Sequence, residues 1–414
     1  MNNSAQMSTI GDITTWYSGG TPSRARSDYW SGDIPWISAF TLKDAEINTS
    51  DQFLTPEAVA AGSRMAPLGS TLLLVRGSAL HNVIRAGMVT SPVAFNQDVK
   101  ALVPKRGVVP KYLTHVIRGN EHELLKLVTS SGNTAGVLDT NVVQAFEIYL
   151  PNEHDQRRLV EAFDDVDKLI ATLERLITKK QAIKQGLMQQ LLTGKIRLPG
   201  FAGQWNDVVL GDHVSYIKTV ALSRAQLDNV SSIRYLHYGD IHTRNSVRLN
   251  AATEDMPRAS HLLVGSAGIL RVGDLVFADA SEDPAGVGKS VEIASVPEDG
   301  VVPGLHTIAA RFNKSVLADG FKAYLQYIPT FRESLLRLAA GTKVLATTRS
   351  YISSISISLP HVDEQRAIAQ VIMDADEEID RLQIRLSKAK AIKQGMMQEL
   401  LTGRTRLPVM EPAS

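Results

Sequence analysis

The stretch "AIKQGLMQQLLTGKIRLP", residues 182–199, returns almost unchanged as "AIKQGMMQELLTGRTRLP", residues 391–408. The second copy lies 209 residues after the first (391 minus 182). A long-period repeat that occurs only twice differs from a solenoid, in which short units recur many times. We interpret it as the duplication of one large module.

The match extends backwards at the same displacement. Leu150-Pro151 corresponds to Leu359-Pro360, and Gln156-Arg157 corresponds to Gln365-Arg366. The sequences between the repeats differ, so the predicted organisation alternates variable segments with repeats. The predicted parts are a first variable segment 1–149, a first repeat 150–199, a second variable segment 200–358, a second repeat 359–408 and a tail 409–414.

Both repeats predict long helices. Apolar residues recur at three- and four-residue steps, which is the pattern of a coiled-coil seam. Each helix is expected to begin just after a proline and to end at a Thr-Gly pair, Gly194 or Gly403, where glycine favours a left-handed cap. The predicted seam residues are Ile170, Leu173, Ile177, Ile183, Leu187 and Leu191 in the first helix and Ile372, Ala375, Ile379, Leu382, Leu386 and Ala389 in the second.

A helix of about 40 residues is about 60 Å long, so a small domain does not cover its seam. We expect the two helices to lie side by side and antiparallel, related by a pseudo-two-fold axis. The variable segments contain short apolar β-type runs, such as residues 69–78 and 272–281, as well as helical spacing. The predicted fold class is therefore α+β: two mixed α/β domains separated by two long antiparallel helices that form a coiled-coil spacer.

Some repeated residues are not needed for the seam. Gly186 and Gly395 lie inside the predicted helices, where glycine costs about 1 kcal/mol relative to alanine. We interpret them as sites where another backbone approaches closely. The repeats also share polar residues that are expected to lean towards solvent, which indicates two copies of one partner. The predicted partner-docking residues are Lys184, Gln185, Gln189, Lys393, Gln394 and Gln398.

Length and composition narrow the class of protein. The 414 residues exceed one ordinary core, and 44% hydrophobic with 21% charged residues is typical of a globular chain. The absence of cysteine excludes disulfides and thiolate zinc sites and is compatible with a reducing cytosol. We find no secretory signal and no apolar run long enough for a membrane span. A cytoplasmic protein is expected, and its net charge of +1 requires any basic nucleic-acid footprint to be local.

The variable segments contain loops that mix arginine, histidine, tyrosine, hydroxyl and amide side chains. Examples are "TPSRARS", residues 21–27, and "SIRYLHYGDIHTRNSVR", residues 232–248. Such side chains bind phosphates and base edges, although any single polar loop is more often only solvated. The candidate DNA contacts are Thr21, Ser23, Arg24, Arg26, Arg76, Ser78, Asn96, Gln97, Ser131, Asn133 and Thr134 in the first segment and Arg234, Tyr238, His242, Arg244, Lys289, Thr342 and Lys343 in the second.

No catalytic, cofactor or metal-binding pattern is found. "DPAGVGKS", residues 283–290, has Asp283 where a phosphate-binding loop requires glycine. "DIPW", residues 33–36, is similar to a methyltransferase tetrapeptide, but no glycine-rich cofactor loop accompanies it. The ten histidines are scattered, and His81 and His306 are expected to make hydrogen bonds. No Gly-x-Ser-x-Gly elbow occurs.

The order of the parts resembles the specificity (S) subunits of type I restriction–modification systems over essentially the whole chain. The resemblance rests on both copies of the repeated helix sequence, residues 182–199 and 391–408. It also rests on "SGGTPS" and "YWSGDIPWIS" within residues 18–38, on "FNQDVKAL" at 95–102 and on "SGNTAGVL" at 131–138. The second segment matches less closely, since "SGNT" is replaced there by "AGTKV".

This resemblance implies a non-catalytic subunit in which each variable segment is a target-recognition domain that reads half of a split DNA sequence. The helices would space the domains and dock two adenine methyltransferase (M) subunits, and restriction (R) subunits would join them. The chain itself would bind no cofactor: S-adenosylmethionine belongs to the M subunits, and ATP and Mg²⁺ belong to the R subunits. A modification-only complex is also compatible with the sequence.

Three alternatives remain open from the residues alone. The helices could form a simple hairpin that holds two unrelated domains. The chain could be a methyltransferase or nuclease in its own right, or a scaffold that binds no DNA. Neither the DNA sequence nor the length of its gap is readable from the chain, because recognition depends on loop geometry and DNA shape.

Overall fold

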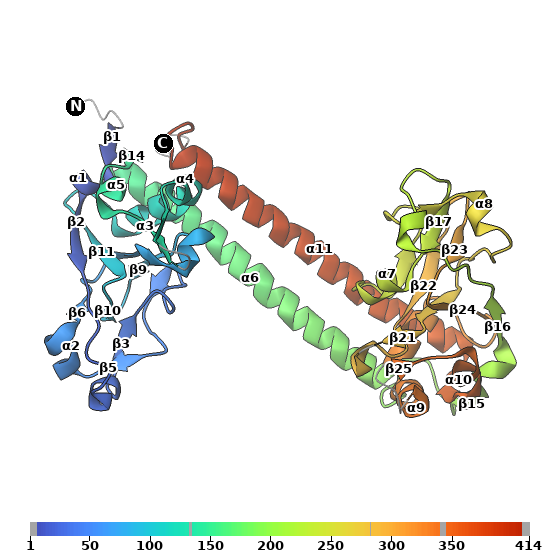
Figure 1. Ribbon diagram of the computed structural model, residues 1–414. Coiled ribbons are helices and arrows are strands. Elements are labelled where there is room, and N and C mark those ends of the chain that lie inside the picture. The colour runs from blue at the N-terminus through green and yellow to red at the C-terminus, as the bar shows by residue number, and fades with distance from the viewer. Residues whose placement is uncertain (1–5, 132–134, 282, 340–344, 408–414) are drawn as a thin grey trace, which may run out of the picture. The chain divides into compact units, whose positions relative to one another are not determined.

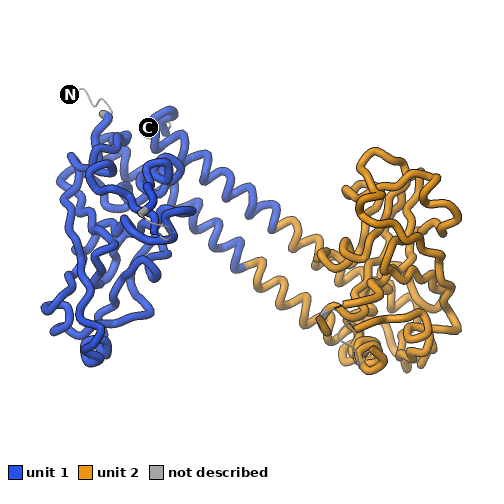
Figure 2. The backbone as a smooth tube through the Cα atoms, in the orientation of Figure 1, with its two compact units in different colours: residues 1–175, 383–414 blue, residues 176–382 orange. Residues whose placement is uncertain are grey.

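The computed structural model describes residues 6–131, 135–281, 283–339 and 345–407. The chain forms two compact units (Figure 2). Unit 1 comprises residues 1–175 and 383–414, and unit 2 comprises residues 176–382. Two 39-residue helices, α6 (Glu153–Leu191) and α11 (Val362–Leu400), each contribute to both units. The units therefore do not coincide with the predicted parts, although each helix lies within its predicted repeat.

Unit 1 is built on a five-stranded sheet of order β2-β11-β7-β9-β4. Its strands are antiparallel except for the parallel pair β4–β9. Helix α3 packs on β7 and β9 through a continuous buried face (Figure 1). The elements of this layer are β2 (Thr14–Ser18), β4 (Glu46–Ile47), β7 (Thr71–Leu74), β9 (Ala86–Val89), β11 (Val99–Pro104), α3 (Pro110–Gly119) and α4 (Glu121–Lys126).

Smaller sheets of unit 1 surround this layer. A parallel pair, β3–β10, is flanked by β5 and β6, and β8 joins the hairpin β12–β13. Strand β1 pairs with β14 directly before α6 begins. Their bounds are β1 (Gln6–Thr9), α1 (Ile10–Ile13), η1 (Ser27–Trp30), β3 (Ile34–Ile37), β5 (Phe53–Leu54), α2 (Pro56–Gly62), β6 (Arg64–Met65), β8 (Arg76–Gly77), η2 (Ser78–His81), β10 (Ala94–Phe95), β12 (Thr129–Ser131), β13 (Ala135–Val137), α5 (Thr140–Gln144) and β14 (Glu147–Leu150).

Unit 2 repeats this framework from a dissimilar sequence. Its main sheet has the order β16-β24-β20-β22-β18, again antiparallel with one parallel edge pair. A parallel pair, β17–β23, corresponds to β3–β10. The strands are β15 (Asn206–Val209), β16 (Val214–Ile217), β17 (Ile233–Leu236), β18 (Arg248–Asn250), β19 (Arg258–Ala259), β20 (Leu275–Ala278), β21 (Ala280–Ser281), β22 (Ser290–Ser295), β23 (Val301–Pro303), β24 (Thr307–Phe312), β25 (Leu345–Ala346) and β26 (Ser356–Leu359).

The helices of unit 2 differ more from those of unit 1. A 3₁₀ segment, η6, replaces part of α3, and α9 packs against it. The bounds are η3 (Leu210–His213), η4 (Arg224–Gln226), α7 (Tyr238–His242), α8 (His261–Val264), η5 (Pro284–Gly286), η6 (Lys322–Tyr327), α9 (Pro329–Ala339) and α10 (Arg349–Ser354). The duplicated module thus includes the variable segments as well as the repeats, although the sequences of the variable segments share little.

A buried glutamine anchors the start of each long helix. Gln156 Oε1 accepts a hydrogen bond from Val109 N at 2.8 Å, and its Nε2 donates to Gly107 O and Pro151 O. Gln365 makes the same three bonds with groups that lie 209 residues further on, Ala318 N, Val316 O and Pro360 O. Both side chains are 1% exposed. These bonds explain why both repeats carry a glutamine at this position.

The two helices run antiparallel in each unit. In unit 1, Asp167 and Glu174 of α6 pair with Lys393 and Lys390 of α11. In unit 2, Lys180 and Lys184 of α6 pair with Glu378 and Asp376 of α11. The predicted antiparallel arrangement of the helices is therefore confirmed within each unit.

The prediction that Ile183 lies in the seam is wrong. Ile183 is 46% exposed, while Leu173, Ile177, Met188 and Leu191 are buried. Lys180 and Lys184 instead take the seam positions between Ile177 and Leu187, which is possible because each faces a carboxylate. Beyond the helix ends, Gly194 and Gly403 adopt φ values of 68° and 72°, as the predicted caps require.

Replacing Gln365 by alanine should destabilise unit 2. The change leaves the Ala318 N–H and two carbonyl groups without their partner in a buried site, so we expect a loss of about 2–4 kcal/mol. Urea unfolding followed by circular dichroism measures it. The exposed Gln383 on the same helix provides the control, because Gln383→Ala should change the stability by less than about 0.5 kcal/mol. Equal effects of both variants would contradict the anchoring role.

Candidate nucleic-acid interface and docking surfaces

Three of the predicted polar loops of unit 1 converge where β10 ends. Gly20 N donates to Phe95 O at 2.9 Å, and Thr21 Oγ1 donates to Gln97 Oε1 at 2.6 Å. Arg76 N donates to the carbonyl of Asp98, two residues after Asn96. The parallel pairing of β3 and β10 brings these loops to one edge, because both strands end there. The candidates around Thr21, Arg76 and Gln97 therefore form one surface.

The arginines of the first loop are held by aromatic rings. Arg24 lies over Trp30 at 4.2 Å from the ring centroid and near Trp36 at 5.5 Å. Arg26 binds Asp28 and lies over Tyr29. The hydrogen bond from Arg26 holds the pKa of the Asp28 carboxyl below its usual range. Such stacking orients the guanidinium group while leaving donors directed outwards.

The remaining candidates of the first segment differ in exposure. Ser23, Arg76, Ser78 and Gln97 are exposed. Asn96 is 5% exposed, and its side chain bonds with Asp98, so it shapes the loop and presents no group to a ligand. Ser131 ends β12, in the hairpin that pairs with β8 through Gly77 and Gly136. Asn133 and Thr134 lie outside the described residues.

The corresponding edge of unit 2 gathers a different set of side chains. Tyr238 begins α7 directly after β17, and its ring meets those of His242 and His306 edge-on, at 6.1 and 5.4 Å. A ring nitrogen of His242 is hydrogen-bonded to Ala280 O at 2.9 Å, and Lys289 Nζ donates to His242 O. Burial lowers the pKa of Lys289. These candidates therefore lie together around the end of β20.

His306 and Asp279 also belong to this group, although no pattern in the sequence placed them there. His306 Nδ1 lies 3.3 Å from Asp279 Oδ1, and Asp279 N donates to His306 O. His306 is a non-glycine residue with a φ of 57°. The position of His306 could have indicated its role. It follows β23 by three residues, and Asn96 and Gln97 likewise follow the equivalent strand β10 in unit 1.

Other candidates of the second segment do not join this group through any contact among the described residues. Arg244 binds Glu254 at 2.5 Å. Arg234 lies on β17 opposite Arg258 and is only partly exposed. Thr342 and Lys343 lie outside the described residues. No hydrogen bond, ion pair or ring contact among the described residues links Arg234 or Arg244 to Tyr238 or His242.

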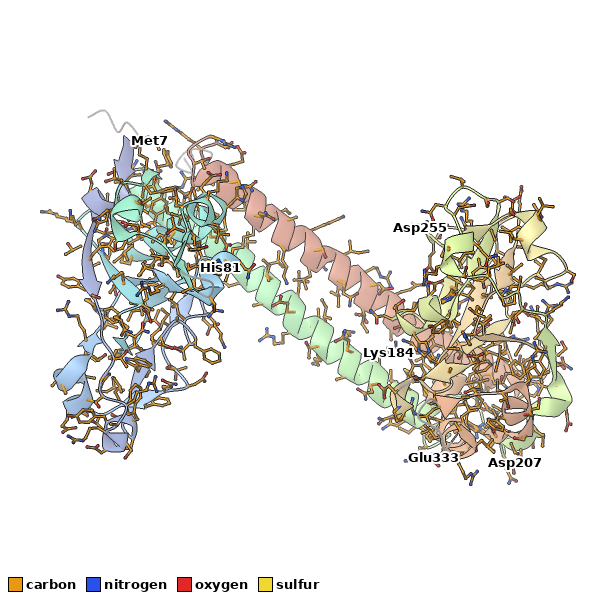
Figure 3. All side chains as sticks on the ribbon, viewed as in Figure 1. Met7, His81, Lys184, Asp207, Asp255 and Glu333 are labelled. Carbon is orange, nitrogen blue, oxygen red and sulfur yellow. The ribbon has the colours of Figure 1, made fainter. Side chains whose placement is uncertain are left out.

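The predicted docking residues divide into two kinds. Lys184 bonds with Asp376, and Lys393 bonds with Asp167; the two pairs are related by the same displacement of 209 residues (Figure 3 labels Lys184 on α6). The expectation that these lysines lean towards solvent is wrong, since their side chains are only 26% and 25% exposed. Pairing within the chain already accounts for their presence in both repeats.

The glutamines lie on an exposed face. We define the repeat face as Ala182, Ile183, Gln185, Gly186 and Gln189 in unit 2 and Ala391, Ile392, Gln394, Gly395 and Gln398 in unit 1. Ile392 is 57% exposed, and the four glutamines are exposed in both units. Both repeats therefore expose one isoleucine and two glutamines on the same helix face.

Gly186 and Gly395 were expected to allow the close approach of another backbone, and no atom of the described chain occupies that space. A Cβ atom added at either position would meet nothing within 4 Å. Packing within the described chain therefore does not explain the retention of glycine inside either helix.

Comparison with known proteins agrees with this geometry. A family profile described as the type I restriction modification DNA specificity domain matches residues 2–185. Residues 2–185 are therefore similar to the DNA specificity domain of type I restriction–modification systems, and this match covers less than half of the chain. The EcoR124I/EcoR124II specificity subunit of Escherichia coli is 31% identical over 179 residues, which are 43% of this chain and 44% of that protein. This match thus spans less than half of the relative's length.

Other relatives cover the whole length. The MjaVIII specificity subunit of Methanocaldococcus jannaschii is 22% identical over 421 residues, covering 96% of this chain and 92% of that protein. The crystal structure of the S subunit from M. genitalium aligns with a TM-score of 0.56 at 11% identity, over 99% of this chain and 98% of that chain. A chain from a study of complex assembly in the type I system aligns with a TM-score of 0.60 at 14% identity, over 96% and 98%. At these identities, the structures show the shared fold.

Among the described residues, no group of three or more histidine, aspartate or glutamate side chains is placed to hold a metal ion. None of the described helices is long and apolar enough to cross a membrane.

The two interior glycines give a direct prediction. Gly186→Ala and Gly395→Ala should each stabilise the free specificity subunit by up to about 1 kcal/mol, because alanine favours the helix and its Cβ meets no atom of the chain. Thermal unfolding measures the change. Gly194→Ala is the matched control with the opposite sign, since Gly194 has a φ of 68° and its Cβ would lie 3.2 Å from the Trp205 ring. Destabilisation by Gly186→Ala would show that packing had been overlooked.

Proposed function

We propose that this chain is the non-catalytic DNA-recognition subunit of a type I restriction–modification complex. Each unit reads one half of an asymmetric bipartite DNA sequence, and the long helices set the gap and dock two adenine methyltransferase subunits. The observation that carries the proposal is one framework built twice, with different polar side chains at the same edge. Because base recognition depends on side-chain type and loop geometry, the two edges would read different base sequences.

The chemistry of each edge supports a reading role. Unit 1 presents an amide, hydroxyls and arginines, of which Gln97 and Arg76 are suited to bidentate contacts with adenine and guanine. Unit 2 presents Tyr238, His242 and His306. The chain carries a net charge of only +1, so we expect the partner subunits to supply much of the contact with phosphates and the isolated chain to bind DNA weakly.

The proposal also assigns the chemistry to partners. Methyltransferase subunits would bind S-adenosylmethionine, and restriction subunits that join the same complex would bind ATP and Mg²⁺. A cytoplasmic location follows from this role. Methyl transfer by the purified chain alone with S-adenosylmethionine would contradict the proposal.

Mapping of modified adenines tests the reading surfaces separately. When the chain is co-expressed with its methyltransferase subunits, Arg76→Ala or Gln97→Ala should relax one half of the recognised sequence, and His306→Ala should affect only the other half. Each lost base contact is worth about 1–3 kcal/mol of discrimination. Lys126→Ala, which removes an exposed ion pair with Glu123, serves as the control. An unchanged recognition sequence in all variants would count against these loops.

Helix length provides a second test. Four residues inserted into each long helix, after Arg175 and after Leu382, add about 6 Å of rise and turn the seam by only about 40° beyond one full turn, which local unwinding of the helix pair accommodates. At about 3.4 Å per base pair along one strand, the gap should lengthen by one or two base pairs while both half-sites stay the same. If mapping of the methylated adenines shows that the gap between the half-sites keeps its length, the spacer role is contradicted.

A further inference from the structure

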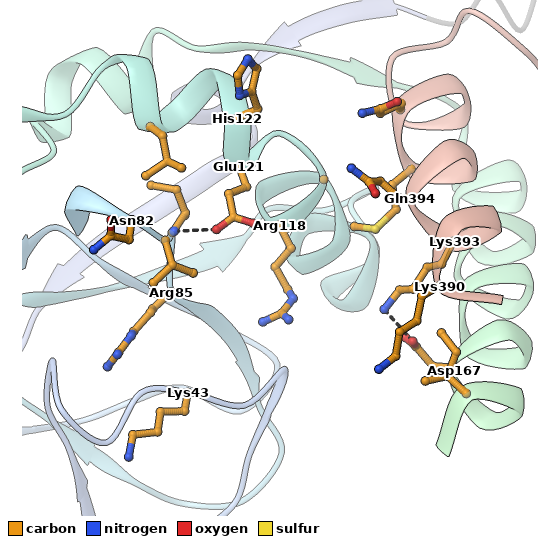
Figure 4. Close-up of a pocket in the computed structure, with 17 residues that line it drawn as sticks. Lys43, Asn82, Arg85, Arg118, Glu121, His122, Asp167, Lys390, Lys393 and Gln394 are labelled. Atoms are coloured by element: carbon orange, nitrogen blue, oxygen red, sulfur yellow. Dashed lines mark hydrogen bonds and ion pairs between the residues drawn. The ribbon is translucent and has the colours of Figure 1, made fainter. Parts of the chain in front are cut away.

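Unit 1 contains a cleft of about 920 Å³ between its α3–α4 segment and the two long helices (Figure 4). Helix α11 contributes five of the lining residues, including Gln394 and Gln398 of the repeat face. Arg118 and His122 face them from the α3–α4 side. The cleft therefore opens directly beside the surface that carries the repeated glutamines.

Positive charge dominates the lining. Five lysine and arginine side chains, Lys43, Arg85, Arg118, Lys390 and Lys393, stand against two acids. Lys390 and Lys393 pair with Glu174 and Asp167 on α6.

The other three cations do not pair with any carboxylate among the described residues. Arg85 and Arg118 are instead oriented by hydrogen bonds to the carbonyls of Ala39 and Ala86, at 2.7 and 2.9 Å. An acidic ligand would thus meet cations that are already oriented, and it would not need to break an ion pair at these three positions.

The lining of the cleft also contains apolar side chains. Val83, Leu125, Ile170 and Met397 belong to it together with the charged residues. Nucleic-acid phosphates are bound by charged and polar groups, so a lining that combines apolar and cationic side chains fits an amphipathic protein helix better than a DNA backbone. Methionine at such a position adapts to the shape of the incoming side chains.

Gly395 provides the second observation. It lies between Gln394 and Gln398 on the helix that forms one wall of the cleft, and a Cβ there would meet open space. A glycine at this point lets another helix backbone approach α11 closely, which offsets its cost within the helix.

We propose that this cleft receives an acidic amphipathic helix of the methyltransferase subunit, which lies across Gly395. The inference rests on the proposed function and adds the chemistry of the docking contact. Unit 2 has Gln181 and Tyr327 at the positions displaced by 209 residues from Lys390 and Arg118. The two methyltransferase subunits therefore dock unequally, and the one at unit 1 depends on charge.

The test uses the full chain assembled with its cognate methyltransferase subunit. Native mass spectrometry and light scattering over a salt series count the bound copies. The wild-type chain should bind two, and salt should release the copy at unit 1 first. The double variant Lys43→Glu/Lys390→Glu should bind that copy about tenfold or more weakly and give a complex with one methyltransferase at low salt.

Arg385→Glu/Lys388→Glu controls for the charge change, because it alters two exposed residues of α11 outside the cleft lining. Glu174→Gln controls for the loss of the ion pair with Lys390. Each of these control variants should retain both copies. Circular dichroism of the free chain checks that all variants are folded, which the exposure of the substituted side chains favours. Gly395→Ala should weaken the same copy while raising the melting temperature of the free chain.

The outcomes separate the two proposals. If the wild-type chain binds two methyltransferase subunits and the Lys43/Lys390 variant binds two with the same salt dependence, the cleft proposal is overturned and the proposed function stands. If that variant loses DNA affinity but keeps both copies, the cleft holds DNA and the docking proposal is wrong. If the wild-type chain binds no methyltransferase subunit, both proposals fail.

Discussion

A lysine in a helix seam requires a carboxylate opposite it, and this constraint fixes how the two long helices pair. Lys184 meets Asp376 in unit 2, and Lys393 meets Asp167 in unit 1. An unpaired charge in this half-buried position would be costly, so a shifted register is penalised at two places at once. The buried Gln156 and Gln365 then tie the start of each helix to its own unit. The same bonds occur twice because the module was duplicated.

Local signals made much of the architecture predictable. The three- and four-residue spacing and the Thr-Gly ends gave both helices, since helix periodicity and left-handed caps are properties of short segments. Apolar spacing alone places Ile183 in the seam, whereas Lys180 and Lys184 occupy it because they pair with carboxylates about 200 residues away in the chain. The shared framework of the variable segments was not predictable, because strand order depends on long-range pairing that diverged sequences do not display.

Only part of the candidate site could be predicted, because its residues come together through long-range strand pairing. Thr21, Arg76 and Gln97 belong to separate loops that the sequence marks as polar, and the parallel pair β3–β10 brings them together. Asn96 looked similar but is buried, and His306 was missed because only the pairing of β17 with β23 places it beside Tyr238. A duplicated frame with unlike side chains at its edges is how one chain would read an asymmetric DNA sequence.

The central structural claim is that the repeated lysine–aspartate pairs set the antiparallel register, and a double-mutant cycle tests it most directly. Lys393→Asp alone places two carboxylates opposite each other, and Asp167→Lys alone places two ammonium groups there. Each should lower the free energy of unfolding, and the combined exchange should restore most of the loss, with a coupling energy of about 1 kcal/mol or more. Purely additive losses in the combined variant would contradict the claim.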